Sequence, residues 1–198
     1  FLNCSKDGYI ALLMMNKESN KYEELYGVPI TENDRKYVAV YPENNGKLCR
    51  DDLEVIYNAS GILMAVGNPR VYSDTYTLGI AGELIKRKYY NGTPYAGVSA
   101  GAILTGEFYE ETVKTANIGD NQIFLASKFN PKVSNGKENI EKVQGFGFLK
   151  EIFLEPHFSE WGLFPALLNK LNDNKYIKTG IGFDENIGIK VTNESRFE

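Results

Sequence analysis

Short apolar runs alternate with polar or amphipathic stretches along most of this chain. Residues 9–15 and 61–66 carry no charged side chain, which is typical of strands buried on both faces of a parallel sheet. Further strands are expected where apolar runs end at turn residues. They lie at 36–41, 94–98, 122–126 and 149–154, and as a strand pair over 177–191 that is broken near 184–186.

Helical patterns fill the intervals between these runs. Two aspartates favour the start of a helix over 51–59, in which Leu53, Ile56 and Tyr57 would share one face. A short helical piece at 22–26 would end at Gly27 and Pro29. Other helices are expected at 73–89, 99–105 and 161–171.

This alternation predicts an α/β fold with a mostly parallel open sheet and helices on both faces. The chain length suits a single domain that covers residues 1–198. The chain opens with Phe1 and closes just after a strand-like segment, so both terminal strands are expected to be incomplete. Ligands of such sheets bind at the carboxyl ends of the strands.

Composition and charge mainly exclude classes of protein. The net charge is -4 and no basic cluster appears, so nucleic acid is not an expected partner. No apolar run approaches the roughly 20 residues that cross a bilayer, and no signal pattern opens the chain. We therefore expect a cytoplasmic protein without a membrane partner. Cys4 and Cys49 indicate neither a disulfide framework nor a zinc site and are expected to be buried thiols.

The candidate nucleophile is Ser99. It is the serine of a G-x-S-x-G motif at residues 97–101, which lies directly between a strand pattern and a helix pattern. In this context the glycines leave room for a sharp turn that holds the hydroxyl clear of the sheet. N–H groups at the following helix start, such as that of Ala100, suit a developing oxyanion. The structural alternative is a glycine-rich turn in which Ser99 only caps the helix.

His157, the only histidine, is the candidate general base. A serine hydroxyl needs a base to remove its proton, and histidine is best matched to that task near neutral pH. His157 ends an apolar run, where a strand would deliver it to the edge of the sheet. Alternatively, the ring packs between Pro156 and Phe158 as a structural residue.

A carboxylate should orient the imidazole, and a backbone donor should complete the oxyanion hole. Asp120 lies after the elbow helix and is the first candidate carboxylate. Gly67 before Asn68 could supply the donor, because glycine lets the backbone approach a ligand, although a plain turn explains the same residues. The other carboxylates, each of which could equally be a solvated surface group, are Glu107, Glu110, Glu155 and Asp184.

These segments together resemble the family of dipeptidase E and cyanophycinase, serine peptidases with a class I glutamine amidotransferase-like, flavodoxin-like fold. The resemblance implies that Ser99 is the nucleophile, that His157 is the base, and that an acidic third member lies between them, where Asp120 matches best. The likeness covers A-S-G-I-L-M-A-V-G-N at 59–68, Y-A-G-V-S-A-G-A at 95–102, G-F-G-F-L-K-E-I-F-L-E-P-H-F at 145–158 and G-I-G-F-D-E-N at 180–186.

The chain departs from the family pattern in three places. Val66-Gly67 stands where family members commonly have two glycines before the asparagine. Segment 159–164 lacks the arginines that suit an arginine-bearing polymer, so cyanophycin is not the expected substrate. The family's glycine-rich first strand would precede Phe1.

We therefore expect a serine-type peptidase that hydrolyses an amide bond of a dipeptide or short peptide through an acyl-enzyme. No metal or organic cofactor is expected. An esterase or another acyl transfer would use the same site, and a non-catalytic amidotransferase-like binding domain is the alternative from another class. A homodimer is compatible with the sequence, which does not decide the oligomeric state.

Overall fold

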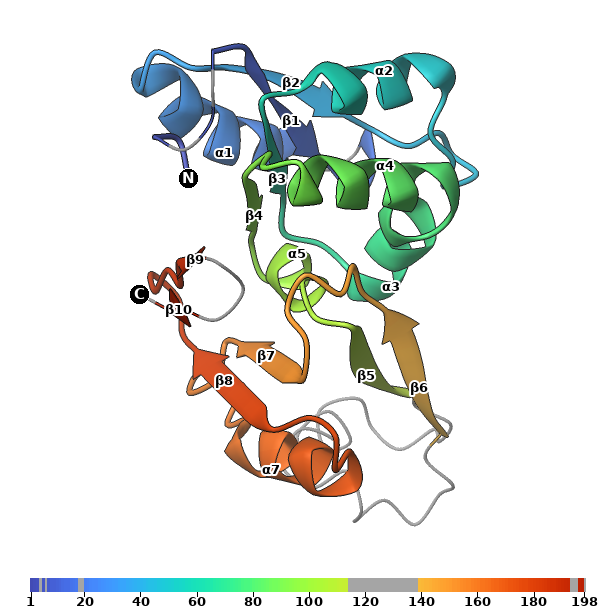
Figure 1. Ribbon diagram of the computed structural model, residues 1–198, viewed down its shortest axis with the longest axis vertical. Coiled ribbons are helices and arrows are strands. Elements are labelled where there is room, and N and C mark those ends of the chain that lie inside the picture. The colour runs from blue at the N-terminus through green and yellow to red at the C-terminus, as the bar shows by residue number, and fades with distance from the viewer. Residues whose placement is uncertain (4, 6, 18–19, 114–138, 193–195, 198) are drawn as a thin grey trace. The chain divides into compact units, whose positions relative to one another are not determined.

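The computed structural model describes residues 1–3, 5, 7–17, 20–113, 139–192 and 196–197 (Figure 1). Contacts within the chain divide it into two compact units. Unit 1 comprises Phe1–Thr105 with Gln144–Phe146, and unit 2 comprises Gly106–Val143 with Gly147–Glu198. Both units combine helices with parallel strand pairs, which confirms the expected α/β class.

A parallel four-stranded sheet forms the centre of unit 1, with its strands in the order β2-β1-β3-β4. Leu13 pairs with Val40 and Met64, and Met64 in turn pairs with Gly97, so the carboxyl ends of the four strands lie in line. The expected strands in this part of the chain are confirmed. Their bounds are Tyr9–Leu13 for β1, Lys36–Val40 for β2, Gly61–Met64 for β3 and Tyr95–Gly97 for β4.

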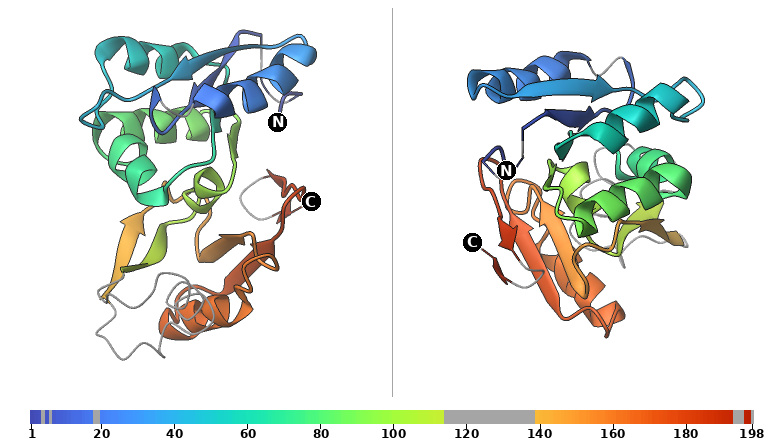
Figure 2. Two further views of the ribbon diagram at one scale, coloured as in Figure 1. Left: turned by 180° about the vertical axis from the view of Figure 1, so that it is seen from behind. Right: turned by 45° about the horizontal axis from the view of Figure 1, so that its top comes forward.

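Helices cover both faces of this sheet, as expected. Ile30 of α1 packs against Ile10 and Leu12 on one face. Helices α2 and α4 lie on the other face (Figures 1 and 2), and their residues Ile56 and Ile85 are fully buried. The helices of unit 1 are α1 (Asn20–Glu32), α2 (Arg50–Asn58), α3 (Pro69–Tyr72), the π-helical turn η2 (Ser73–Thr77), α4 (Gly79–Tyr90) and α5 (Ala100–Ile103).

The expectation that Gly27 and Pro29 end the first helix is wrong, because α1 continues through both residues to Glu32. A Cβ atom on Gly27 would lie closer than 3.0 Å to the ring of Tyr37, so glycine allows α1 to pack closely on β2. This packing outweighs the penalty of an internal proline, which is about 3 kcal/mol.

The helix expected over 73–89 is divided at Leu78. Residues before this point form the π-helical turn η2, and α4 begins at Gly79, whose φ of +59° suits glycine. The hydroxyls of Ser73 and Thr77 both donate to the carbonyl of Gln144, over 2.7 and 3.1 Å. These bonds hold the turn in a conformation that the sequence pattern alone does not reveal.

Cys49 is exposed, which corrects the expectation of a buried thiol. The residue stands at the N-cap of α2, where its backbone N–H donates to the carboxylate of Asp52 over 2.9 Å, so its place is set by the helix start. Cys4 lies outside the described residues. In the part of the chain that the structure describes, no helix is long and apolar enough to cross a membrane.

Unit 2 contains the parallel strands β7 and β8, and Leu167 of α7 packs against Phe153 of β7. The strand expected at 149–154 begins later and therefore ends next to His157. Two strands within 106–147, β5 and β6, were not expected, and the strand expected at 122–126 lies outside the described residues. The bounds are β5 Phe108–Val113, β6 Asn139–Gln144, β7 Ile152–Pro156, α7 Phe164–Asp173, β8 Thr179–Phe183, β9 Val191–Thr192 and β10 Arg196–Phe197.

Candidate active site

Ser99 stands at a sharp turn between β4 and α5. Its backbone has φ 51° and ψ −107°, a combination that a residue with a side chain rarely adopts. This conformation is typical of the strained strand-to-helix turn that presents a nucleophilic serine. The side chain of Ser99 makes no capping hydrogen bond to α5, so the structural alternative of a capping serine is not what the turn shows.

The two motif glycines make this turn sterically feasible. A Cβ atom on Gly97 would lie closer than 3.0 Å to the carbonyl of Gly101, and a Cβ atom on Gly101 would lie 2.5 Å from the carbonyl of Met64. Backbone atoms cannot move aside as flexible side chains can. The helix that follows Ser99 therefore packs directly on β4 and β3, and its first residue, Ala100, is buried.

Gly67 and Asn68 lie in the loop after β3, at the same edge of the sheet as Ser99, because β3 and β4 are parallel neighbours. The side chain of Asn68 accepts hydrogen bonds from the backbone of Arg70 and Val71 over 2.9 and 3.2 Å and thereby caps α3. These contacts are those of an ordinary turn and helix cap. A role of the Gly67 N–H in binding an oxyanion stays a prediction.

Buried tyrosine hydroxyls hold this edge of unit 1 in place. The hydroxyl of Tyr95 donates to the carbonyl of Gly101 over 2.9 Å, which ties the elbow helix to its own strand. The hydroxyl of Tyr76 donates to the carbonyl of Met14 over 2.8 Å, just beyond β1. Burial raises the pKa of both tyrosines well above the usual value, so both hydroxyls remain protonated donors at neutral pH.

His157 directly follows β7 in unit 2 and also has a positive φ, 59°. Its ring stacks on the indole of Trp161, with ring centroids 4.3 Å apart and an interplanar angle of 20°. The backbone N–H of Trp161 donates to the carbonyl of His157 over 2.9 Å. The stack and the tight turn together restrict the orientation of the imidazole.

A carboxylate that the sequence analysis missed faces His157. Oε1 of Glu185, in the loop after β8, lies 3.5 Å from Nδ1 of His157. The neighbouring carboxylate of Asp184 accepts hydrogen bonds from the hydroxyl and the backbone N–H of Ser159, over 2.5 and 2.6 Å. The hydroxyl bond is the main reason that the pKa of Asp184 is lowered, and the charge of His157 adds to it.

These contacts join the loops after two parallel strands, and both loops therefore define the surroundings of His157. The backbone N–H of Glu185 donates to Oε1 of Glu160 over 3.0 Å, which adds a further link between them. Glu185 belongs to the G-I-G-F-D-E-N segment that ends β8. Its place at a strand end is the signal that could have identified it, because such ends meet at one edge of a sheet.

The other candidate carboxylates have different surroundings. Glu155 is buried in unit 2 and pairs with Lys170 of α7. Glu107 accepts a hydrogen bond from the backbone N–H of Glu151 over 3.2 Å. Glu110 lies in β5, and Asp120 lies outside the described residues, so its role stays a prediction.

Ser99 belongs to unit 1 and His157 to unit 2, so the structure describes a nucleophile elbow and a histidine loop as two separate halves. The first half has strained backbone and helix-start N–H groups, and the second has an oriented imidazole beside a carboxylate. Among the described residues, no group of three or more His, Cys, Asp or Glu side chains could hold a metal ion.

Residues 45–197 match the model of peptidase family S51, a span that includes both halves. The chain belongs to peptidase family S51. It is accordingly a serine-type peptidase, and the resemblance to the dipeptidase E family is confirmed. A search of curated proteins gives no match.

Two solved structures share the fold of this S51 family member. A peptidase from an acI-B1 Actinobacterium has a TM-score of 0.64 and 17% sequence identity, covering 92% of this chain and 69% of that chain. A putative peptidase E from Listeria monocytogenes EGD-e has a TM-score of 0.53 and 12% identity, covering 90% of this chain and 78% of that one. At such low identities these likenesses establish the fold alone.

Proposed function

We propose that this S51 peptidase hydrolyses an amide bond of a dipeptide or short peptide through an acyl-enzyme. Ser99 attacks the carbonyl carbon while Nε2 of His157 takes the hydroxyl proton, and the imidazolium then gives this proton to the leaving amine. Water hydrolyses the acyl-enzyme by the same route. Because the nucleophile and the base come from different units, both units act in this scheme as one hydrolytic domain over residues 1–198.

The observation that carries this proposal is the backbone of Ser99, with φ 51° and ψ −107° between two glycines that tolerate no side chain. Strain of this kind, on the order of 1–3 kcal/mol, persists where the surrounding structure holds a functional group in place. A serine that served only as a helix cap would adopt ordinary extended backbone and would bond to the helix amides.

In this scheme the backbone N–H groups of Ala100 and Gly67 bind the oxyanion of the tetrahedral intermediate. The start of α5 at Ala100 supports the first donor, since the N–H groups of a first helical turn have no partner within the helix. The position of Gly67 at the same sheet edge supports the second. Asn68 fixes the loop that carries Gly67 by capping α3.

The histidine needs a carboxylate that holds Nδ1–H and leaves Nε2 for the serine. The distance of 3.5 Å between Glu185 and Nδ1 supports Glu185 in this role, and the stack on Trp161 supports a fixed ring. Asp120, which the family motif favours, is the second candidate. The variants Glu185→Gln and Asp120→Asn separate these two candidates.

The substrate in this proposal is a small peptide rather than a nucleic acid or a membrane component. The net charge of -4, without a basic cluster, supports the exclusion of nucleic acid. We place the reaction in the cytoplasm, where the exposed Cys49 thiol would stay reduced.

Labelling with a fluorophosphonate, combined with assays on a panel of dipeptides, tests the proposal. Wild-type protein is expected to be labelled at Ser99 and to cleave some dipeptides, whereas Ser99→Ala loses both properties, with kcat lower by at least about a thousandfold. Ser60→Ala, which removes a hydroxyl bonded to the carbonyl of Tyr9, is the matched control and keeps both.

The possible results separate the alternative functions. Labelling at Ser99 without cleavage of any peptide would support an esterase instead. Absence of labelling in a folded protein would support a non-catalytic binding domain and would overturn the proposal.

A further inference from the structure

Helix α4 carries an exposed stripe on the side that faces away from the sheet. Ile80, Glu83, Arg87 and Tyr90 follow the spacing of three, four and three residues that places side chains on one helix face. Ile80 is 75% exposed and Tyr90 is 56% exposed. We call these four residues the α4 stripe.

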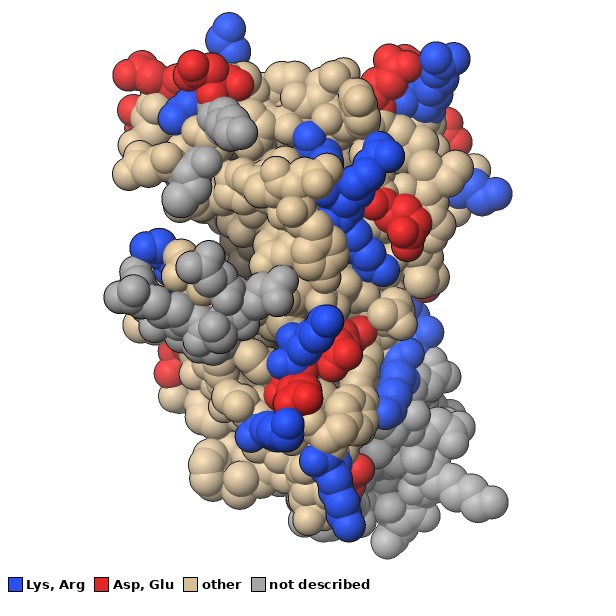
Figure 3. Space-filling model, in the orientation of Figure 1, with Lys and Arg blue, Asp and Glu red and all other residues tan. Residues whose placement is uncertain are grey.

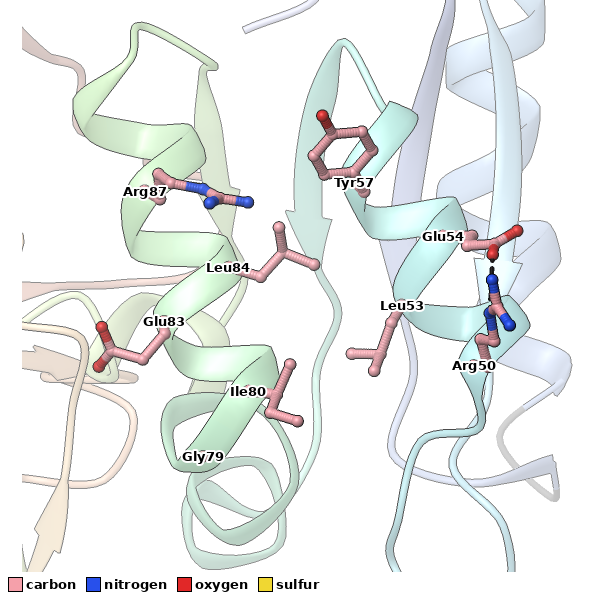
Figure 4. Close-up of a pocket in the computed structure, with 9 residues that line it drawn as sticks. All are labelled: Arg50, Leu53, Glu54, Tyr57, Gly79, Ile80, Glu83, Leu84 and Arg87. Atoms are coloured by element: carbon pink, nitrogen blue, oxygen red, sulfur yellow. Dashed lines mark hydrogen bonds and ion pairs between the residues drawn. The ribbon is translucent and has the colours of Figure 1, made fainter.

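Ile80, Glu83 and Arg87 of the α4 stripe also line a groove between α4 and α2, which has a volume of about 820 Å³ (Figure 4). Leu53 of α2 and Ile80 of α4 point toward one another across it, and Tyr57, which is 59% exposed, lines its end. The ammonium of Lys88 donates to the carbonyl of Tyr57 over 2.7 Å, so α2 and α4 are linked into one surface.

The order of side chains along the α4 stripe is complementary to itself when reversed. It reads apolar, acidic, basic, apolar, so an antiparallel copy of the same helix brings each acidic group opposite a basic group. A two-fold axis at the level of residue 85 would place Glu83 opposite Arg87 of the second copy, and Ile80 opposite Tyr90 of the second copy. A two-fold interface uses the same patch on both subunits, which is the condition that this stripe meets.

We propose that the α4 stripe is the interface between two copies of this chain, packed antiparallel around a two-fold axis. Two Glu83 to Arg87 ion pairs lie at its centre, about 6 Å apart along the helix, and the two apolar pairs lie at its ends. The groove beside Ile80 receives Tyr90 of the second copy. Aromatic residues and arginine are the types enriched in such interfaces.

Within one copy, the ring of Tyr90 packs edge-on against that of Tyr89, with ring centroids 5.4 Å apart, and Tyr90 remains 56% exposed. The Nζ atom of Lys86 lies 3.9 Å from Glu83, whose side chain is 82% exposed, and a surface pair of this length contributes little. Arg50 pairs with Glu54 within α2 over 3.1 Å, outside the α4 stripe. Figure 3 shows acidic and basic side chains next to one another over this face, with uncharged surface around them.

Charge reversal tests the proposal by analytical ultracentrifugation over a wide range of protein concentration. Wild-type protein is expected to form a dimer, and Glu83→Arg or Arg87→Glu alone should raise its dissociation constant by at least about tenfold, because like charges then face each other. The double variant Glu83→Arg/Arg87→Glu restores the pairs and should restore the dimer. Lys150→Glu, an exposed reversal in unit 2, is the control and should leave the dimer intact.

Mixing the two single variants provides a stricter test. Glu83→Arg then carries two arginines in the stripe and Arg87→Glu carries two glutamates, so the mixture should form a heterodimer more tightly than either variant forms a homodimer. A monomeric wild type would overturn the proposal and would indicate that the groove serves a different partner. A double variant that stays monomeric would also overturn it. Melting temperatures and peptidase assays on the same variants separate these results from misfolding and from a failure of the proposed reaction.

Discussion

Ser99 and His157 share a backbone feature, since both have a positive φ although neither is glycine. His157 comes directly after β7, and Ser99 comes two residues after the end of β4, where the chain must turn sharply to present the side chain beyond the strand end. The strain is offset by close neighbours: the elbow packs on Met64 through Gly101, and the imidazole stacks on Trp161. Both halves of the candidate site thus depend on packing around single residues.

The variants Glu185→Gln and Asp120→Asn decide which carboxylate orients His157. If Glu185 holds Nδ1–H, Glu185→Gln should lower kcat by about 10- to 100-fold with little change in KM, because only the general base is disturbed. Glu185→Asp should recover part of the loss. Steady-state kinetics and the rate of fluorophosphonate labelling measure both effects.

The same assays on Asp120→Asn complete this comparison. Loss of kcat in Asp120→Asn, with normal kcat in Glu185→Gln, would assign the role to Asp120 and contradict Glu185. Glu151→Gln is the matched control, because Glu151 lies in the same unit and pairs only at the surface with Lys178, over 2.6 Å.

At the scale of elements, the elbow is a contact between a strand and the helix that follows it. Gly97→Ala should destabilise the protein by about 1–3 kcal/mol or more, because the new methyl group would overlap the carbonyl of Gly101 and push α5 off β4. Urea denaturation measures the change, and peptidase activity should fall with it. Gly188→Ala is the control: open space surrounds that position, so a change within about 0.5 kcal/mol is expected.

Strand β7 and helix α7 are joined by the buried pair of Glu155 and Lys170, whose side chains are 4% and 14% exposed. Glu155→Ala should destabilise the protein by about 3–5 kcal/mol, because it leaves the ammonium buried without its carboxylate. The double variant Glu155→Leu/Lys170→Met should recover most of this loss. If Glu155→Ala instead kept full stability and lost only kcat, Glu155 would be a site residue rather than a structural one.

At the scale of the whole molecule, buried tyrosines make the free energy of unfolding depend on pH in the alkaline range. Burial raises the pKa of Tyr76 well above 10, the usual value. Below pH 10 the hydroxyl is protonated in both the folded and the unfolded chain. Above it the unfolded chain loses the proton first, so the free energy of unfolding should fall by about 1.4 kcal/mol per pH unit for this residue.

Tyr76→Phe isolates this contribution. At pH 7 the variant should be less stable than wild type by about 1–2 kcal/mol, because the carbonyls of Met14 and Val40 lose a donor. This difference should shrink above pH 10, as measured by urea denaturation at several pH values. A constant difference would contradict the argument, and Tyr176→Phe is the control because that ring is half exposed.

The sequence pattern predicted the four parallel strands of unit 1 because each is a short apolar run bounded by turn residues. It did not predict β5 or β6, since segments such as N-I-E-K-V-Q at 139–144 mix charged and apolar residues without a clear face. It also placed a helix end at Pro29, where packing on β2 prevails over local preference.

The sequence by itself determined the α/β class, the elbow serine and the lone histidine, because these follow from periodicity and from residue types at fixed spacing. Only the tertiary structure decided the strained conformation of Ser99, the exposed place of Cys49 and the approach of Glu185 to His157. A motif fixes which residues are adjacent in the chain. Which of several carboxylates reaches an imidazole 28 positions away depends on how two strand ends and their loops pack.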